Sequence, residues 1–381
     1  MISHPPKKII SDLYLAGKPQ VAWTTLIADL ATPVSAMLKL ADGRPNSFLL
    51  ESVEGGKVRG RFSIIGMNPD IIWKFKKKIA QINRRARINT DEFETCPEEP
   101  LQSLRALVSE SRIELPEELP PMASGLFGYM GYDSVRLNED IPDKNPDDLM
   151  VPDGLFLRPS LICIFDRLKD IVTIVTPIWP DQGVSAESAF EAAMTRLNDA
   201  TADFQRSLPY RRERSSDHAN INNPESNTTK DEFHDMVHKA KDYINAGDIF
   251  QVVPSQRFSV PFNLPPMALY RSLRRLNPSP YLFFFDFGEF SIVGSSPEIL
   301  VTLRDNTVTL RPLAGTRPRG KDIEEDKALA KELLEDPKER AEHLMLLDLG
   351  RNDVGRVSTV SYTHLRAHET SLHLVCRLLL E

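Results

Sequence analysis

The stretch RPLAGTRPRG, residues 311–320, combines residue types that suit small-molecule chemistry. It places three arginines and two glycines around Thr316. Glycine allows a ligand to approach the backbone closely, and arginine supplies a cationic fork that matches carboxylate or phosphate. The stretch therefore suits a small anion. A solvated turn after a strand is the other interpretation.

A carboxylate follows two serines and a proline in VGSSPEIL, residues 293–300. A serine N-cap, then Pro297, then Glu298 in the first turn is the pattern of a helix start. The alternative is that Glu298 points into a cleft. Partial burial there raises the pKa of a carboxyl enough for proton donation near neutral pH.

Gln251 lies between bulky apolar residues in DIFQVVPSQRFSV, residues 248–260. We interpret this stretch as a strand. Gln251 is then either an edge-strand residue bonded to a neighbour or a group that faces a site.

Glu342 lies in RAEHLMLLDLGRND, residues 340–353. A carboxylate beside an apolar stripe is paired with a basic group or holds a metal. Two expectations accompany the helix: burial of Leu344, Leu347 and Leu349, and a polar network that ends it. That network would be formed by Asp348, Arg351, Asn352 and Asp353.

The elements that position these side chains are strands and helices in mixed order. Apolar runs and turn signals predict strands at 47–52, 62–66, 155–167, 170–178, 281–288, 290–296, 299–304 and 307–313. Helical spacing predicts helices at 185–204, 323–335 and 338–350. A capping box of Thr229 and Glu232 begins another helix, and Gly247 ends it. The fold class is α/β or α+β, with antiparallel strands wherever short hairpins join them.

Composition limits the class of protein. The 381 residues carry a formal net charge of −7, which disfavours nucleic acid as the main partner. Three cysteines form no CxxC pair, so a reducing, cytosolic setting fits. The longest apolar runs are too short to span a bilayer.

Taken in order, these motifs resemble component I of anthranilate synthase, a member of the chorismate-utilising enzymes. The matching stretches are LLES (49–52), GLFGYMGYD (125–133), GDIFQVVPSQRF (247–258), NPSPYLFFFDFG (277–288), IVGSSPEILV (292–301), RPLAGTRPRG (311–320) and EHLMLLDLGRNDVGRVS (342–358). The resemblance implies large antiparallel-rich sheets packed face to face with helices outside.

The resemblance also implies a reaction. Ammonia would add to the ring of chorismate, the ring hydroxyl would leave, and pyruvate would be eliminated to give anthranilate. Gly315 and Thr316 match residues that contact chorismate, and Glu342 matches one of two Mg²⁺-binding glutamates. Glu298 matches the acid that assists departure of the hydroxyl.

Two positions distinguish the reaction from its relatives. Enzymes of this kind that add water carry a lysine where this chain has Gln251, and glutamine cannot deprotonate water. Aminodeoxychorismate synthases carry a lysine where this chain has Ala314, which cannot form their covalent adduct. Aminodeoxychorismate synthase remains the alternative enzyme. A non-catalytic tryptophan-binding module is the alternative outside enzymes.

Feedback regulation and a partner are implied as well. Ser52 of LLES and the segment Pro280, Tyr281 and Leu282 match a regulatory tryptophan site, with Leu282 in place of the usual methionine. A glutamine amidotransferase subunit would supply the ammonia, because no amidotransferase triad is evident here.

The resemblance ends near Ser358. The expected domains are 1–205, a mobile linker at 206–229, and a chorismate-binding domain at 230–358. Residues 359–381 look like a foreign tail where relatives carry the second Mg²⁺ glutamate. We therefore expect the fold to be incomplete and the 381-residue chain to be inactive.

Overall fold

The computed structural model describes residues 3–41, 43–52, 60–208, 224–318 and 320–358. Its contacts divide the chain into two compact units. The first comprises Met1–Pro209 with Tyr270–Glu381, and the second is Tyr210–Leu269. The domain limits expected from sequence stay predictions. The segment expected to be a foreign tail lies outside the described residues.

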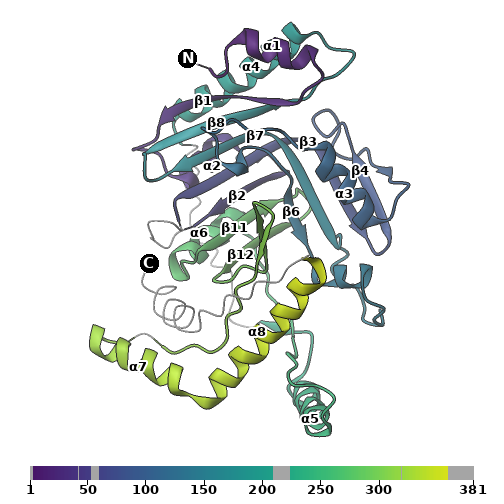
Figure 1. Ribbon diagram of the computed structural model, residues 1–381, viewed down its shortest axis with the longest axis vertical. Coiled ribbons are helices and arrows are strands. Elements are labelled where there is room, and N and C mark those ends of the chain that lie inside the picture. Colours follow the sequence, from purple (N-terminus) through teal and green to yellow (C-terminus); the bar gives the residue numbers. More distant parts are fainter. Residues whose placement is uncertain (1–2, 42, 53–59, 209–223, 319, 359–381) are drawn as a thin grey trace. The chain divides into compact units, whose positions relative to one another are not determined.

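A ten-stranded antiparallel sheet forms the centre of the first unit (Figure 1). Its strands are β1 (Gln20–Ile27), β2 (Ser47–Glu51), β3 (Phe62–Lys76), β4 (Ile79–Asn83), β5 (Glu94–Thr95), β6 (Phe127–Met130), β7 (Gly154–Asp166), β8 (Ile171–Ile178), β11 (Tyr281–Asp286) and β12 (Ser291–Ser296). The order along the sheet is β1-β8-β7-β3-β2-β11-β12, with β4 and β6 paired to β3 and β7, and β5 to β4. The late strands β11 and β12 thus extend a sheet built by the first half of the chain.

Helices of the first unit are α1 (Lys7–Leu15), α2 (Pro33–Leu40), α3 (Pro100–Glu110), α4 (Ala186–Gln205), α7 (Ile323–Glu335) and α8 (Pro337–Val357), with short 3-10 turns at Pro121–Ala123 and Tyr132–Leu137. Helix α6 (Pro266–Leu276) crosses the boundary between the units. The predicted helix at 185–204 is confirmed as α4, which packs on β8 and buries Ala193, Leu197 and Ala200. Among the described helices, none is long and apolar enough to cross a membrane.

Two hydrophobic clusters stabilise the sheet. The first contains Phe48, Ile162 and Phe285, and so joins β2, β7 and β11. The second surrounds Trp73 and Leu107, where α3 covers β3 and β4. The mixed, antiparallel-rich fold class is confirmed. The part of the chain described here contains one large sheet, and its other two sheets have two strands each.

The second unit contains β9 (Glu225–Ser226), α5 (Lys230–Ala246) and β10 (Phe258–Ser259), with β9 and β10 paired. The capping box of α5 is confirmed, because the Glu232 backbone N–H donates to Thr229 Oγ1 and the Glu232 carboxylate accepts from the Thr229 backbone N–H. Gly247 ends the helix with φ 82°.

The strand predicted at 248–260 is wrong except for Phe258–Ser259. In the described part of this stretch, strand pairing is limited to the two-residue ladder of β10 with β9. Pro254 lies in the middle of the stretch and has no N–H to donate to a ladder. The segment therefore runs without regular structure.

The helix start predicted at Pro297 and Glu298 is also wrong, because residues 297–301 form no helix. Ser296 is the last residue of β12, and its Oγ accepts a hydrogen bond from the Glu298 backbone N–H at 3.2 Å. The serine hydroxyl thus stabilises a turn that leaves the strand. Beyond it, β13 (Thr302–Arg304) and β14 (Thr307–Thr309) form a separate two-stranded pair.

Two expectations for α8 are corrected. The helix continues through the proposed terminal network to Val357, and it buries none of its residues. Leu344 is 59% exposed and Leu349 is 57% exposed. At 100° per residue Leu344 and Leu347 share one side of the helix, whereas Leu349 points about 140° away from Leu344, so no single face gathers all three.

Candidate functional site

Gly315 and Thr316 lie in a segment without regular structure between β14 and α7. A Cβ on Gly315 would stand 1.7 Å from Oε2 of Glu339. The glycine therefore leaves room for the Glu339 carboxylate directly beside the Gly-Thr pair. Sequence reasoning did not single out Glu339; its position three residues before Glu342 on a helix was the available signal.

Arg317 joins the Gly-Thr segment to the junction of α7 and α8. Its Nε donates to Glu332 Oε1 at 3.1 Å, and its Nη2 donates to Asp336 Oδ2 at 2.9 Å. Its Nη1 lies 3.6 Å from Glu339 Oε1. The hydrogen bond to Glu332 is the largest cause that raises the pKa of Arg317. Because carboxylates already surround this cation, Arg317 is a structural link and not an open anion ligand.

Glu298 is exposed, and its carboxylate binds the backbone that leads to the Gly-Thr segment. Leu313 donates its backbone N–H to Glu298 Oε1 at 3.0 Å. Leu313 lies two residues before Gly315, so the structure brings these two sequence-predicted positions into one neighbourhood. Glu298 thus lacks the partial burial that was considered for it from the sequence.

Glu342 lies half-buried on α8, one turn after the half-buried Glu339. The spacing of three residues places both carboxylates on the same side of the helix. Among the described residues, no group of three or more histidine, cysteine, aspartate or glutamate side chains could hold a metal. A pair of carboxylates still suits Mg²⁺, which keeps several waters and binds through one or two carboxylates plus substrate oxygens.

Gln251 is exposed in the second unit, whereas the other sequence-predicted site residues lie in the first. Its relation to Glu298 and Gly315 stays a prediction.

The segments predicted to form the regulatory site are brought together. Strand β2 pairs with β11 in antiparallel register, with Glu51 opposite Leu282. Ser52 is the next residue after Glu51, and Tyr281 directly precedes Leu282. Two segments far apart in sequence thus meet at one end of a strand pair. Pro280 and Leu282 are buried, and Tyr281 is 36% exposed.

Glu51 was not singled out from sequence, although it lies within LLES. Its side chain is 0% exposed. The carboxylate accepts from Tyr270 Oη at 2.7 Å and from Arg274 Nε at 2.7 Å, and Arg167 Nη2 lies 3.4 Å away. Burial, followed by the Glu51 charge, holds the pKa of Tyr270 well above its usual range. This network ties β2 to α6 directly beside Ser52.

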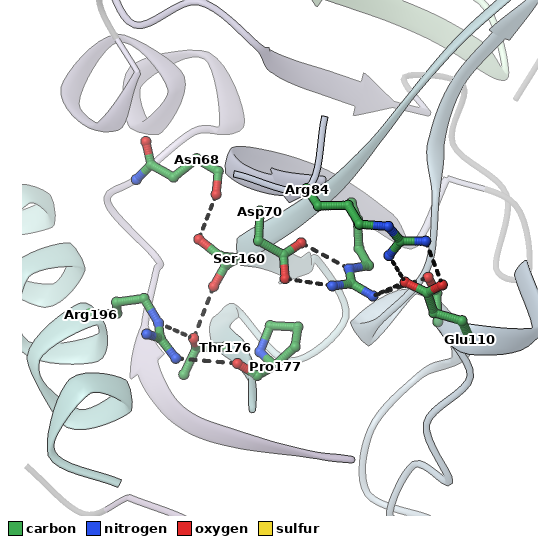
Figure 2. A network of polar contacts seen from close by, with 10 residues as sticks. Asn68, Asp70, Arg84, Glu110, Ser160, Thr176, Pro177 and Arg196 are labelled. Atoms are coloured by element: carbon green, nitrogen blue, oxygen red, sulfur yellow. Dashed lines mark hydrogen bonds and ion pairs between the residues drawn. The ribbon is translucent and has the colours of Figure 1, made fainter. Parts of the chain in front are cut away.

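A second polar network lies along β7 (Figure 2). Arg158 donates from Nε and Nη2 to Asp70 at 2.8 and 2.9 Å, and its Nη1 lies 3.7 Å from Glu110. Arg84 donates both Nη groups to the same Glu110 carboxylate. The carboxylates of Asp70 and Glu110 are therefore each paired with an arginine, which holds these side chains in place.

Comparison with known proteins decides the family. Residues 48–376 match the chorismate binding enzymes. Anthranilate synthase component 1 of Cereibacter sphaeroides is 54% identical over 345 residues, which cover 91% of this chain and 69% of that protein. The chain belongs to the anthranilate synthase component 1 family of chorismate-binding enzymes.

Other members of the family agree. Anthranilate synthase component 1 of Thermus thermophilus is 43% identical over 92% of this chain and 73% of that protein. The crystal structure of anthranilate synthase component I from Streptococcus pneumoniae is similar with TM-score 0.62 and 33% identity, over 80% of this chain and 64% of that chain. The menaquinone-specific isochorismate synthase of Escherichia coli, at 15% identity and TM-score 0.52, shares the fold.

The chain spans roughly two thirds of these family members, 69% of the Cereibacter protein and 64% of the Streptococcus chain. The family match also runs to residue 376, past Ser358 and into the segment expected to be foreign. That expectation stays a prediction, because residues 359–381 lie outside the described ranges.

Proposed function

We propose that this protein is the chorismate-converting component of an anthranilate synthase. It would add ammonia to chorismate and release pyruvate to give anthranilate. The observation that carries the proposal is the 54% identity to an anthranilate synthase component 1 across 91% of the chain. The bond between Glu298 and the Leu313 backbone supports it, because it holds an acid near Gly315 and Thr316.

Each residue of this neighbourhood has a proposed role. Gly315 and Thr316 contact chorismate, with glycine allowing close approach of the backbone. Glu298 donates a proton to the departing ring hydroxyl. Glu342 holds Mg²⁺, and Glu339 on the same side of α8 supplies a second hard oxygen donor. When bound, Mg²⁺ would neutralise the substrate carboxylate.

Ammonia is the nucleophile in this proposal because Gln251 cannot deprotonate water, whereas ammonia is nucleophilic without that help. Ala314 separates the proposal from aminodeoxychorismate synthase, since alanine offers no amine for a covalent adduct. A glutamine amidotransferase subunit would supply the ammonia in a cytoplasmic complex. Tryptophan would inhibit by binding at Ser52 and at Pro280, Tyr281 and Leu282. The pairing of β2 with β11 supports that site.

Calorimetry tests the chorismate and magnesium roles together. We expect chorismate to bind the chain in the presence of MgCl₂ and to bind much more weakly without it. The Glu342→Gln variant should lose the magnesium dependence. Glu335→Gln, which alters an exposed carboxylate on α7, is the matched control.

Two results of that titration would contradict the proposal. One is binding of tryptophan with no binding of chorismate, which would favour a non-catalytic tryptophan-binding module. The other is equal magnesium dependence in Glu342→Gln and Glu335→Gln.

A further inference from the structure

A cavity of about 410 Å³ opens on the first unit between α3, the loop after it and the start of β7. Its apolar walls are formed by Leu104, Val108, Ile113, Leu115, Leu126 and Phe156. Volumes of about 300–1,000 Å³ with apolar walls and a few polar groups are typical of small-molecule sites. None of the residues proposed for chorismate, Mg²⁺ or tryptophan lines it.

The cavity stays open because its walls belong to different parts of the core. Ile113 and Leu115 pack against the cluster around Phe48. Leu104 and Phe156 pack against the cluster around Trp73. Each wall is thus held by its own cluster, and neither can move across the gap without leaving its contacts.

Gly125 adds space on the backbone side of the cavity. Its φ is +145°, and a Cβ placed there would meet no heavy atom within 4 Å. Ser111, which also lines the cavity, is held in place because its Oγ accepts from Arg158 Nη1 at 3.4 Å and Asp70 holds that arginine in a two-point contact.

Two polar groups of the lining lack protein partners. Ser124 Oγ is buried and makes no hydrogen bond. Arg112 is exposed, and its guanidinium makes no ion pair or hydrogen bond in the part of the chain that the structure describes. Ser124 is one of the residues that line the cavity. A cation and a hydroxyl beside apolar walls select a ligand with an apolar body and an anionic head.

We propose that this cavity is a binding site for a small aromatic carboxylate. The ring lies between the wall that contains Phe156 and the wall that contains Ile113. Its carboxylate pairs with Arg112 and accepts a hydrogen bond from Ser124. The proposal uses no residue of the proposed chorismate or tryptophan sites, and it stands whether or not the proposed reaction is correct.

The probe is 2-naphthoate, titrated into the intact chain and followed by calorimetry. We expect saturable binding to one site, with 2-naphthol and acetate each binding at least about tenfold more weakly, since each lacks one half of the recognition. Arg112→Gln should weaken 2-naphthoate binding about tenfold. The control is Arg105→Gln, which alters an exposed arginine on α3 that does not line the cavity.

A second variant tests the cavity itself. Val108 is 43% exposed at its rim, so Val108→Trp should fill it and abolish binding. Circular dichroism and the melting temperature establish whether Val108→Trp is folded. If it does not fold, the effect of Arg112→Gln on 2-naphthoate binding tests the proposal. Excess tryptophan or chorismate should leave 2-naphthoate binding unchanged. Unaltered binding in Arg112→Gln, or displacement by tryptophan, would overturn the proposal.

Discussion

At the scale of single residues, Glu51 is notable because its carboxylate is fully buried. A fully buried carboxylate is costly unless it is paired and hydrogen-bonded. Here a tyrosine hydroxyl and two arginines meet that need, and they come from α6 and from the turn after β7. From the sequence alone, Glu51 is visible only as an acidic residue at the end of an apolar strand. Its partners lie far along the chain, so local pattern could not predict them.

Replacement of Glu51 by glutamine should destabilise the protein strongly. The change leaves Arg274 and Arg167 facing a neutral amide, and loss of one partner from a buried ion pair costs roughly 3–5 kcal/mol. Urea unfolding at neutral pH measures the loss. Glu187→Gln, which breaks an exposed pair with Lys7, should have no measurable effect. Equal losses in the two variants would contradict the assignment of Glu51.

Ser52 should control tryptophan binding without affecting chorismate. A phenylalanine at this position adds bulk where β2 ends beside β11. We expect Ser52→Phe to abolish the calorimetric signal of tryptophan and to leave that of chorismate unchanged. In an active form of the enzyme it should relieve inhibition without lowering uninhibited turnover. Tryptophan binding as strong as in the wild type would refute this role.

The stability of the fold should depend on pH through the carboxyl group of Asp166. The hydrogen bond from Arg61 is the main cause that lowers the pKa of Asp166 below its usual value of 3.8. A carboxyl with a lower pKa in the folded state stabilises the fold above its unfolded pKa, and this contribution is lost as the pH falls through the folded value. Melting temperatures from neutral pH to about pH 3 should therefore fall less steeply in Asp166→Asn. Parallel curves would contradict the prediction.

At the scale of elements, helices with strong caps were predictable and their tertiary contacts were not. The predicted helix at 323–335 coincides with α7, because Asp322 caps its N-terminus and a new cap at Asp336 begins α8. The role of Arg317 in joining this junction to the Gly-Thr segment depends on three carboxylates that no local pattern groups together. In the second unit, the apolar residues of 248–260 predicted a strand, but the structure forms one only at Phe258–Ser259.

Arg317→Met should loosen the Gly-Thr segment. The variant removes the hydrogen bonds to Glu332 and Asp336, so amide hydrogen exchange across residues 313–318 and the start of α8 should accelerate several-fold. Arg317→Lys should restore part of the protection. Arg340→Met, at an exposed position of α8, should leave exchange in the Gly-Thr segment unchanged. The structural link would be refuted if Arg317→Met behaved like Arg340→Met.

At the scale of the whole molecule, hairpins joined by short turns were predictable, as for β7 and β8. The position of β11 between β2 and β12 was not predictable, because β2 and β11 are paired although they lie far apart in the sequence. The family was predictable because it depends on motifs in a fixed order along the chain and not on tertiary contacts. The burial predicted for Leu344 and Leu349 was wrong, and their spacing of five residues places them on different sides of α8.

Formation of anthranilate is the measurement that tests the proposed function most directly. Two proteins would be incubated with chorismate, ammonium and MgCl₂: a fusion of residues 1–358 with the C-terminal part of the Cereibacter relative, and the same fusion carrying Glu342→Gln. We predict that the fusion forms fluorescent anthranilate and that its Glu342→Gln variant forms far less. A folded fusion that yields 4-amino-4-deoxychorismate, isochorismate or no product would contradict the proposed function.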